Sequence, residues 1–176
     1  ELIVRGEALP RHIWSADTNL TNPELVRKIH EEYVEAGCNY ITTNTFRTTK
    51  RSYLKLGLSQ DEAINKSTRS LYSAVNLAKR ANSGKQQILG SIAPLEDCYK
   101  PELFPEEQIA YDEFKIIGNH LIDAGVDILL LETMNSIIET KICLSALESF
   151  NIPIWVSFSL KNDNELLSSD KIIDAL

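Results

Sequence analysis

Two patterns of apolar residues alternate along the chain. Apolar positions at helical spacing predict helices over residues 23–36, 60–82, 106–124 and 137–147. Short continuous apolar runs predict strands near 40–45, 87–92, 128–132 and 154–159. A further helix is expected to begin after Ser169–Asp170, and residues 1–21 show no clear period. Because strands alternate with helices, we expect a parallel sheet built from consecutive βα units.

Local signals mark where the predicted helices begin. The segment Asn22–Glu24 combines a cap residue, a proline at the first helical position and an acid in the first turn. Ser59 and Glu62 have the spacing of a capping box, and Ser136 can cap the helix that follows it. Helical spacing assigns these residues to buried faces: Leu25, Val26, Ile29, Tyr33, Ala36, Ile64, Leu71, Ala74, Val75, Ala78, Ile109, Ile116, Ile117, Leu121, Ile137, Ile138, Ile142, Leu144 and Leu147.

The segment Ala124–Met134 is the most informative stretch of the sequence. Gly125 can end a helix in a left-handed turn, and the apolar run Ile128–Leu131 is typical of a strand that is buried on both faces. This strand ends on Glu132. Ligands of parallel α/β sheets bind at the carboxyl ends of the strands, so Glu132 is a candidate ligand-binding carboxylate. A solvated turn residue or a partner in the cap of the next helix is the alternative.

Residues 36–46 resemble this stretch 88 positions earlier in the chain. Ala, Gly and Thr occur at 36, 37 and 45 and again at 124, 125 and 133. Asn39 and Asn44 occupy the positions of Asp127 and Glu132. A spacing of 88 residues is two units of 44, a reasonable length for one strand and helix with their loops. The echo therefore predicts a repeated βα architecture.

Composition and charge narrow the class of protein. The 176 residues suffice for one domain, and 43% hydrophobic and 24% charged residues are ordinary for a soluble globular protein. A net charge of −7 argues against a nucleic-acid partner, and no apolar run approaches the ~20 residues needed to span a membrane. Three widely spaced cysteines favour a reducing compartment, so we expect a cytoplasmic location.

Three further features have both a structural and a functional interpretation. Trp14, in the segment without a period, is a packing anchor or the wall of a ligand site. His30, next to Ile29, is expected at the helix surface or as a hydrogen-bonded histidine. The long loop 93–105 holds three prolines and Cys98. Loops of that length are often functional, and proline-stiffened packing over a strand end is the alternative.

Several short motifs together resemble the homocysteine S-methyltransferase family. They are Asn22-Pro-Glu-Leu-Val, Ile29-His30, Tyr33, Ala36-Gly37, Ile41-Thr-Thr-Asn-Thr-Phe46, Leu131-Glu132-Thr133 and Trp155-Val-Ser-Phe158. The resemblance runs over nearly the whole chain. Trp14-Ser15-Ala16 is similar to the branch of the family that uses S-methylmethionine or S-adenosylmethionine as the methyl donor.

The resemblance implies an α/β fold that is part of a TIM (βα)8 barrel. The chain would supply the loop after strand one and then strands two to five with their helices, in a parallel sheet. Barrels of this kind usually need about 250 residues. We therefore expect residues 1–176 to be a single domain, the N-terminal half of such a barrel, truncated at both ends.

The resemblance also implies a reaction, the zinc-dependent transfer of a methyl group to the thiol of homocysteine to give methionine. The three cysteine ligands of the family's zinc would lie beyond Leu176. Cys38, Cys98 and Cys143 are not expected to converge on a metal, and their spacings match no compact zinc pattern. We therefore expect no metal ligand and no catalytic residue within this chain, and no activity from the 176 residues alone.

The resemblance assigns substrate-binding roles to five residues. Glu132 would bind the ammonium group of homocysteine in a charge-assisted pair. Trp14, Asn44, Thr45 and Ser157 would line the pocket near the sulfur or the carboxylate. The loop Pro94–Pro101 departs from the Gly- and Tyr-rich loop of the S-methylmethionine branch. This departure leaves the methyl donor open, a cobalamin- or folate-dependent donor included.

Two alternatives accompany this interpretation. The protein could be a non-catalytic barrel relative that binds a small amino acid or acts as an interaction module. An isolated half-barrel is also expected to self-associate through exposed strand edges, because these edges present unpaired backbone groups.

Overall fold

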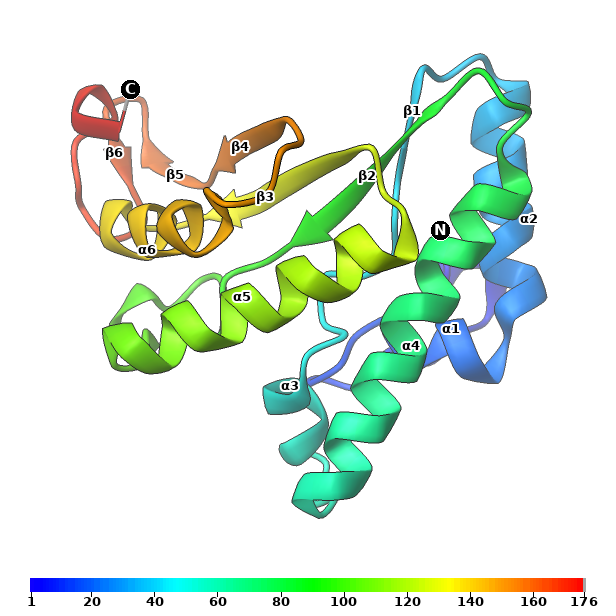
Figure 1. The fold of residues 1–176 in the computed structure, drawn as a ribbon, viewed down its shortest axis with the longest axis horizontal. Helices are drawn as coiled ribbons and strands as arrows, with labels where there is room; N and C mark the ends of the chain where they lie inside the picture. The colour runs from blue at the N-terminus through cyan, green and yellow to red at the C-terminus, as the bar shows by residue number, and fades with distance from the viewer. Residues whose placement is uncertain (176) are drawn as a thin grey trace.

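The computed structural model describes residues 1–175 (Figure 1). Ahead of the sheet lie the 3-10 helix η1 (Ile3–Arg5) and the helices α1 (Thr18–Thr21) and α2 (Pro23–Glu35). The central elements are β1 (Tyr40–Thr42), α3 (Lys50–Leu54), α4 (Gln60–Ala81), β2 (Gln87–Ile92), η2 (Pro101–Leu103), α5 (Glu107–Ala124), β3 (Ile128–Met134), α6 (Ile137–Leu147) and β4 (Ile154–Phe158). The chain then forms β5 (Leu160–Asn162), β6 (Glu165–Leu166) and η3 (Ile172–Ala175).

The predicted parallel sheet is confirmed. Its strand order is β1-β2-β3-β4, and each neighbouring pair is parallel. Strand β1 is shorter than expected, because the chain turns after Thr43. The Thr45 N–H donates to the Thr43 carbonyl at 2.8 Å, and the two threonine hydroxyls are hydrogen-bonded to each other at 2.8 Å. The residues from Asn44 onward therefore lie beyond the carboxyl end of β1 and outside the sheet.

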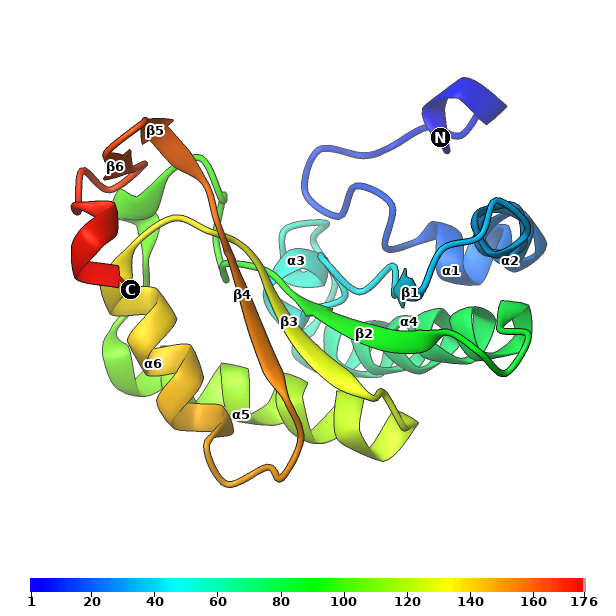
Figure 2. The same ribbon diagram turned by 90° about the horizontal axis from the view of Figure 1, so that it is seen from above.

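The sheet is strongly curved. Helices α4, α5 and α6 lie along one face of it, and the N-terminal segment lies on the other side (Figure 2). The rings of Tyr40 in β1 and Trp155 in β4 meet edge to face with centroids 5.0 Å apart, although two strands separate them. Side chains of the first and last strands can touch in this way only when the sheet bends around its inner face, as the wall of a barrel does.

The hydrophobic core lies between the outer face of the sheet and the helices. Ile41, Ile88, Leu129 and Leu131 point outward from the strands and pack with helix residues that include Phe114 and Leu147. Gly90 allows the end of α5 to approach β2 closely. A Cβ atom at Gly90 would lie 3.1 Å from the Val126 side chain and 3.2 Å from that of Leu121. This packing fixes the helices behind the strand ends that build the site.

Most of the predicted helix-end signals are confirmed. Ser59 and Glu62 form both hydrogen bonds of the capping box. Ser136 caps α6 by accepting a hydrogen bond from the backbone N–H of Glu139. Gly37 and Gly125, the paired glycines of the internal echo, both have left-handed backbones, with φ of 91° and 83°. The echo therefore reflects two equivalent turns from a helix into a strand.

Asn22 occupies the predicted N-cap position and α2 begins at Pro23, but the Asn22 side chain makes no capping hydrogen bond. The Asn22 amide instead donates to the Glu7 carboxylate at 2.7 Å, which ties the N-terminal segment to the start of α2. The helix predicted after Ser169–Asp170 is present as a short 3-10 helix, Ile172–Ala175. The Asp170 carboxylate accepts a hydrogen bond from the Ile137 N–H at 2.8 Å and so serves the start of α6.

Some residues assigned to buried faces are exposed. Tyr33, Ile64, Ile109, Ile116 and Ile138 are between 45% and 55% exposed, and Ala36 is also exposed. Each helix packs on the sheet along one narrow stripe, so apolar residues on the flanks of that stripe keep contact with solvent. Two segments between the predicted elements also contain regular structure, α3 within 47–57 and the β5–β6 hairpin after β4. No helix among residues 1–175 is long and apolar enough to cross a membrane.

Candidate functional site

A cavity of about 590 Å³ opens at the carboxyl ends of β1 and β3. Four parts of the chain supply its walls: the segment before α2, α2 itself, the residues at the end of β1 and after β1 and β2, and the end of β3. The wall residues that matter below are Trp14, His30, Asn44, Phe46, Cys98, Tyr99, Glu132 and Thr133. The volume lies in the range of small-molecule sites, and the position is where parallel sheets bind ligands.

Glu132 lies in this cavity as a half-buried carboxylate. Its Oε2 atom accepts a hydrogen bond from the Ser91 hydroxyl at 2.7 Å. Its Oε1 atom accepts no hydrogen bond from residues 1–175. One oxygen is therefore fixed by β2, and the other remains able to accept a hydrogen bond from a ligand cation.

The backbone beside Glu132 is irregular. The register between β3 and β4 shifts between Leu131 and Met134, which marks a bulge at the end of the strand. Thr133 has a φ of 65°, in the left-handed region that β-branched residues rarely adopt. Trp14, on another wall of the cavity, has a φ of 43°. Strained residues of this kind gather at ligand sites, where the surrounding structure holds them in place.

Asn44 also borders the cavity, but its side chain already has three partners in the protein. Its amide donates to the Ser15 carbonyl and to the Asn19 side chain, each at 2.9 Å. Its side-chain oxygen accepts from the Ser15 hydroxyl at 2.5 Å. Asn44 therefore fastens the Trp14–Ser15 segment over the end of β1 and so shapes the cavity wall.

Thr45 is buried and is not part of the cavity wall. Its hydroxyl donates to the Ser91 carbonyl at 2.7 Å. Since the hydroxyl of Ser91 holds Glu132, Thr45 supports the carboxylate from behind. Direct contact between Thr45 and a substrate stays a prediction.

Trp14 combines both of the roles considered for it. Its ring is stacked on Phe46, with centroids 5.5 Å apart and planes within 3°. The Arg47 guanidinium carbon lies 5.2 Å from the centre of the Trp14 ring. The ring is thus a packing anchor that also forms a cavity wall.

Ser157 is not among the described residues that line the cavity. It is exposed on β4, two positions after Trp155 and on the same face of the sheet by strand alternation. That face is the inner, concave one, which carries Glu132 as well. A role for Ser157 in substrate binding stays a prediction.

His30 is the cavity residue whose placement the sequence analysis predicted wrongly. It is 9% exposed, and its Nε2 atom is buried without a hydrogen-bond partner in residues 1–175. Burial lowers the pKa of the imidazole, which favours the neutral ring. The sequence did contain a signal for this burial, because His30 lies one helical turn after the apolar Val26. Both residues are buried and lie on the same face of α2.

The family assignment follows from comparison with known proteins. The family model described as homocysteine S-methyltransferase matches residues 2–176. The chain belongs to this family.

Individual homocysteine S-methyltransferases are similar over the whole chain. The homocysteine S-methyltransferase 1 of Arabidopsis thaliana is 27% identical, over all of this chain and 60% of its own length. The homocysteine S-methyltransferase of Escherichia coli K12 is also 27% identical, over all of this chain and 61% of its own length. The chain thus spans about three-fifths of the curated relatives it matches.

A solved structure of the family confirms the predicted fold class. The metallated form of the homocysteine methyltransferase MmuM from Escherichia coli superposes with a TM-score of 0.87 at 26% identity. The match covers 99% of this chain and 65% of that chain. The four parallel strands and their helices are therefore part of a (βα)8 barrel, as the motifs predicted.

The residues of this chain do not fit a metal site by themselves. Within residues 1–175, no three His, Cys, Asp or Glu side chains gather where they could hold an ion. Cys98 and Cys143 are buried, and burial raises the pKa of each thiol, which disfavours the thiolate that binds metals. Cys38 precedes β1, at the opposite end of the strands from the cavity.

Proposed function

We propose that the protein to which these residues belong transfers a methyl group to the thiol of homocysteine and so produces methionine. The family assignment and the names of the similar enzymes support the reaction class. The observation that carries the proposal for this chain is Glu132, whose carboxylate borders the cavity with one oxygen that has no hydrogen-bond partner among residues 1–175. An amino-acid ammonium is a fitting partner for such a group.

Recognition of homocysteine would then depend on residues that this chain positions. Glu132 binds the ammonium group, and the Ser91 hydroxyl keeps the carboxylate in orientation. Trp14, Asn44, Thr45 and Ser157 are proposed near the sulfur or the carboxylate of the substrate. An ammonium–carboxylate pair that is partly shielded from water is stronger than one at the surface, and it discriminates against thiols without an amino group.

The transfer joins the homocysteine sulfur to the methyl carbon while the bond from that carbon to the donor sulfur breaks. The thiol proton is released, and the donor loses its positive charge. S-methylmethionine or S-adenosylmethionine is the proposed donor. Zinc is part of the proposal for the intact protein, where it would stabilise the thiolate, with ligands other than residues of this chain. A cytoplasmic location belongs to the same proposal.

The direct test is an assay of the full-length protein that contains this chain. Purified protein is incubated with homocysteine and either proposed donor, methionine is quantified, and bound zinc is measured on the same sample. Methionine formation that needs both substrates is the expected result. Homocysteine binding by calorimetry without methionine formation from any donor would overturn the proposal and indicate the non-catalytic relative instead.

A further inference from the structure

A second cavity, of about 340 Å³, adjoins the first. It lies between the segment before α1, the residues after β1 and the loop after β2, so it is also on the carboxyl side of the sheet. Trp14 and Tyr99 border both cavities and form the partition between them. A ligand in the second cavity would therefore lie next to a ligand held by Glu132.

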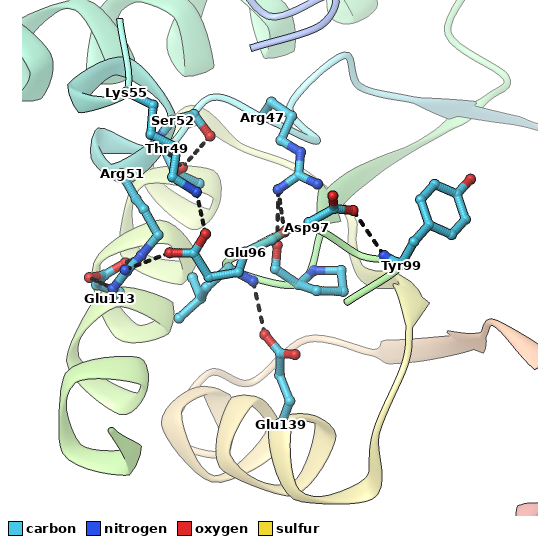
Figure 3. Close-up of polar contacts among 12 residues, drawn as sticks. Arg47, Thr49, Arg51, Ser52, Lys55, Glu96, Asp97, Tyr99, Glu113 and Glu139 are labelled. Carbon is cyan, nitrogen blue, oxygen red and sulfur yellow. Dashed lines mark hydrogen bonds and ion pairs between the residues drawn. The ribbon is translucent and has the colours of Figure 1, made fainter. Parts of the chain in front are cut away.

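Arg47 is the central group of this second cavity. It is 8% exposed, yet no carboxylate of residues 1–175 lies within ion-pairing distance of it. Its Nη1 atom donates to the backbone carbonyls of Glu96 at 2.5 Å and Pro94 at 3.5 Å (Figure 3). Its other nitrogens donate to no oxygen of residues 1–175. A buried guanidinium is unfavourable unless it is paired, so Arg47 lacks the anion that its burial calls for.

The carboxyl groups around Arg47 form no ion pair with it within residues 1–175, although the charge of Arg47 acts to lower the pKa of the buried Glu139. Glu96 is neutralised by two cations, since it pairs with Arg51 at 2.8 Å and with Lys55 (Figure 3). Asp97 uses its Oδ1 atom to accept a hydrogen bond from the Tyr99 N–H at 3.1 Å. Arg11 and Lys100, which line the same cavity, form no ion pair within residues 1–175. The cavity therefore presents more positive than negative charge to a ligand.

We propose that the second cavity binds the carboxylate of the methyl donor and that Arg47 pairs with it. This inference rests on the proposed function, because it assumes a second substrate beside homocysteine. A guanidinium matches a carboxylate with two parallel N–H donors, whereas it repels the positively charged sulfur of a sulfonium donor. The donor would thus lie with its carboxylate at Arg47 and its methyl group toward the first cavity, where Glu132 holds homocysteine.

A carboxylate at Arg47 could also be that of homocysteine, and steady-state kinetics separate the two sources. In the full-length protein, Arg47→Gln keeps a side-chain N–H for the Glu96 carbonyl but removes the charge. The KM for S-methylmethionine should rise about 10- to 100-fold, as expected when a charged hydrogen bond is lost, while the KM for homocysteine stays unchanged. Arg69→Gln, at an exposed position of α4, is the matched control and should change neither value.

A change in the ligand tests the same contact without any risk to folding. The wild-type protein should use S-methylmethionine about 10- to 100-fold better, in kcat/KM, than the methyl ester of S-methylmethionine. Arg47→Gln should lose this discrimination, and Arg47→Lys should keep part of it, because it retains the charge without the paired donors. A rise confined to the KM for homocysteine, or equal use of acid and ester by the wild type, would overturn the inference.

Calorimetry distinguishes this inference from the proposed function. S-methylmethionine is titrated into the full-length protein without homocysteine. Binding that weakens at least 10-fold in Arg47→Gln, in a protein that shows no methyl transfer, would support the carboxylate site while removing the proposed function. Methyl transfer with equal donor affinity in Arg47→Gln and wild type would support the proposed function and overturn the carboxylate site at Arg47.

Discussion

The carboxylate of Glu139 accepts a hydrogen bond from the backbone N–H of Leu95 at 2.8 Å and so joins α6 to the loop after β2 (Figure 3). Glu139 is 2% exposed, and burial raises its pKa from 4.5 to about 7. The Leu95 N–H and the charges of Arg47 and Arg51 oppose this rise. The same loop carries Cys98 and Tyr99 to the cavity, so Glu139 helps to position a wall of the site.

The raised pKa of Glu139 predicts that stability depends on pH. The folded protein binds the Glu139 proton more tightly than the unfolded chain does, so this group lowers the free energy of unfolding as pH rises from about 4.5 to about 7. Glu139→Gln keeps an oxygen that can accept the hydrogen bond from the Leu95 N–H, and it removes the pH-dependent loss of stability. As the pH is raised from 5 to 8, the free energy of unfolding of Glu139→Gln should increase relative to that of wild type, by about 3 kcal/mol at most. Chemical denaturation at both pH values measures the difference.

A glutamate of the same loop provides the control for this measurement. Glu102 is exposed, and Glu102→Gln should show the same pH dependence as wild type. If Glu139→Gln and wild type also lose stability in parallel between pH 5 and pH 8, Glu139 does not retain a proton in the folded protein.

Gly118 predicts a second effect on stability, at the contact between α5 and α6. A Cβ atom there would lie 2.4 Å from the Leu147 side chain and 2.7 Å from the Phe150 ring. Gly118→Ala should therefore destabilise the protein by about 1–2 kcal/mol, although alanine favours a helix over glycine. Asn119→Ala, at the exposed neighbouring position, should be neutral or slightly stabilising. Equal or higher stability of Gly118→Ala in thermal unfolding would show that the two helices separate easily.

Local signals explain why much of the fold could be predicted. The capping box at Ser59 and the left-handed glycines at 37 and 125 depend on neighbouring residues only, and all are confirmed. The strand order followed from the alternation of strands and helices. Burial on the flanks of helices was not predictable in this way. Ile64 and Ile116 have helical spacing like their buried neighbours, and only the packing of α4 against α5 decides their exposure.

The site was predictable where one residue follows an apolar run and not where distant segments meet. Glu132 was found because it terminates an apolar run, and the structure places it in the cavity. In the sequence, Arg47 is one of several basic residues between 47 and 55. Its burial comes from contacts with the chain almost 50 positions later, at Pro94 and Glu96. Sequence spacing carries no information about such a contact, and the same holds for the link between Glu139 and Leu95.

The edges of the sheet predict self-association for a polypeptide limited to these 176 residues. Within the described residues, β1 pairs only with β2, and β4 pairs only with β3. Trp155 and Val156 of β4 are 41% and 37% exposed, and Tyr40 of β1 is 42% exposed. Unpaired apolar edges recruit other strands, so light scattering should show dimers or larger species. Val156→Lys should reduce them, whereas a monomer at high concentration would contradict the prediction.

The last prediction concerns Glu132 in the full-length protein. Glu132→Gln keeps the size of the side chain and an acceptor for the Ser91 hydroxyl, but it removes the charge that would pair with the homocysteine ammonium. Loss of one partner of a shielded ion pair costs about 2–5 kcal/mol, which is at least a ~30-fold fall in kcat/KM for homocysteine. The loss should appear mainly in KM, because the ammonium is remote from the reacting sulfur, and the zinc content should not change.

A substrate without the amino group makes this prediction specific. 4-Mercaptobutanoate has the thiol and the carboxylate of homocysteine but no ammonium, so its kcat/KM should be nearly the same for Glu132→Gln and wild type. Glu148→Gln, at an exposed position that follows α6, is the control for general effects of a lost charge. Suppose instead that Glu132→Gln leaves the homocysteine kinetics intact and lowers only the melting temperature. Glu132 would then be a structural residue at the end of β3, and the ammonium of the substrate would have to be bound elsewhere.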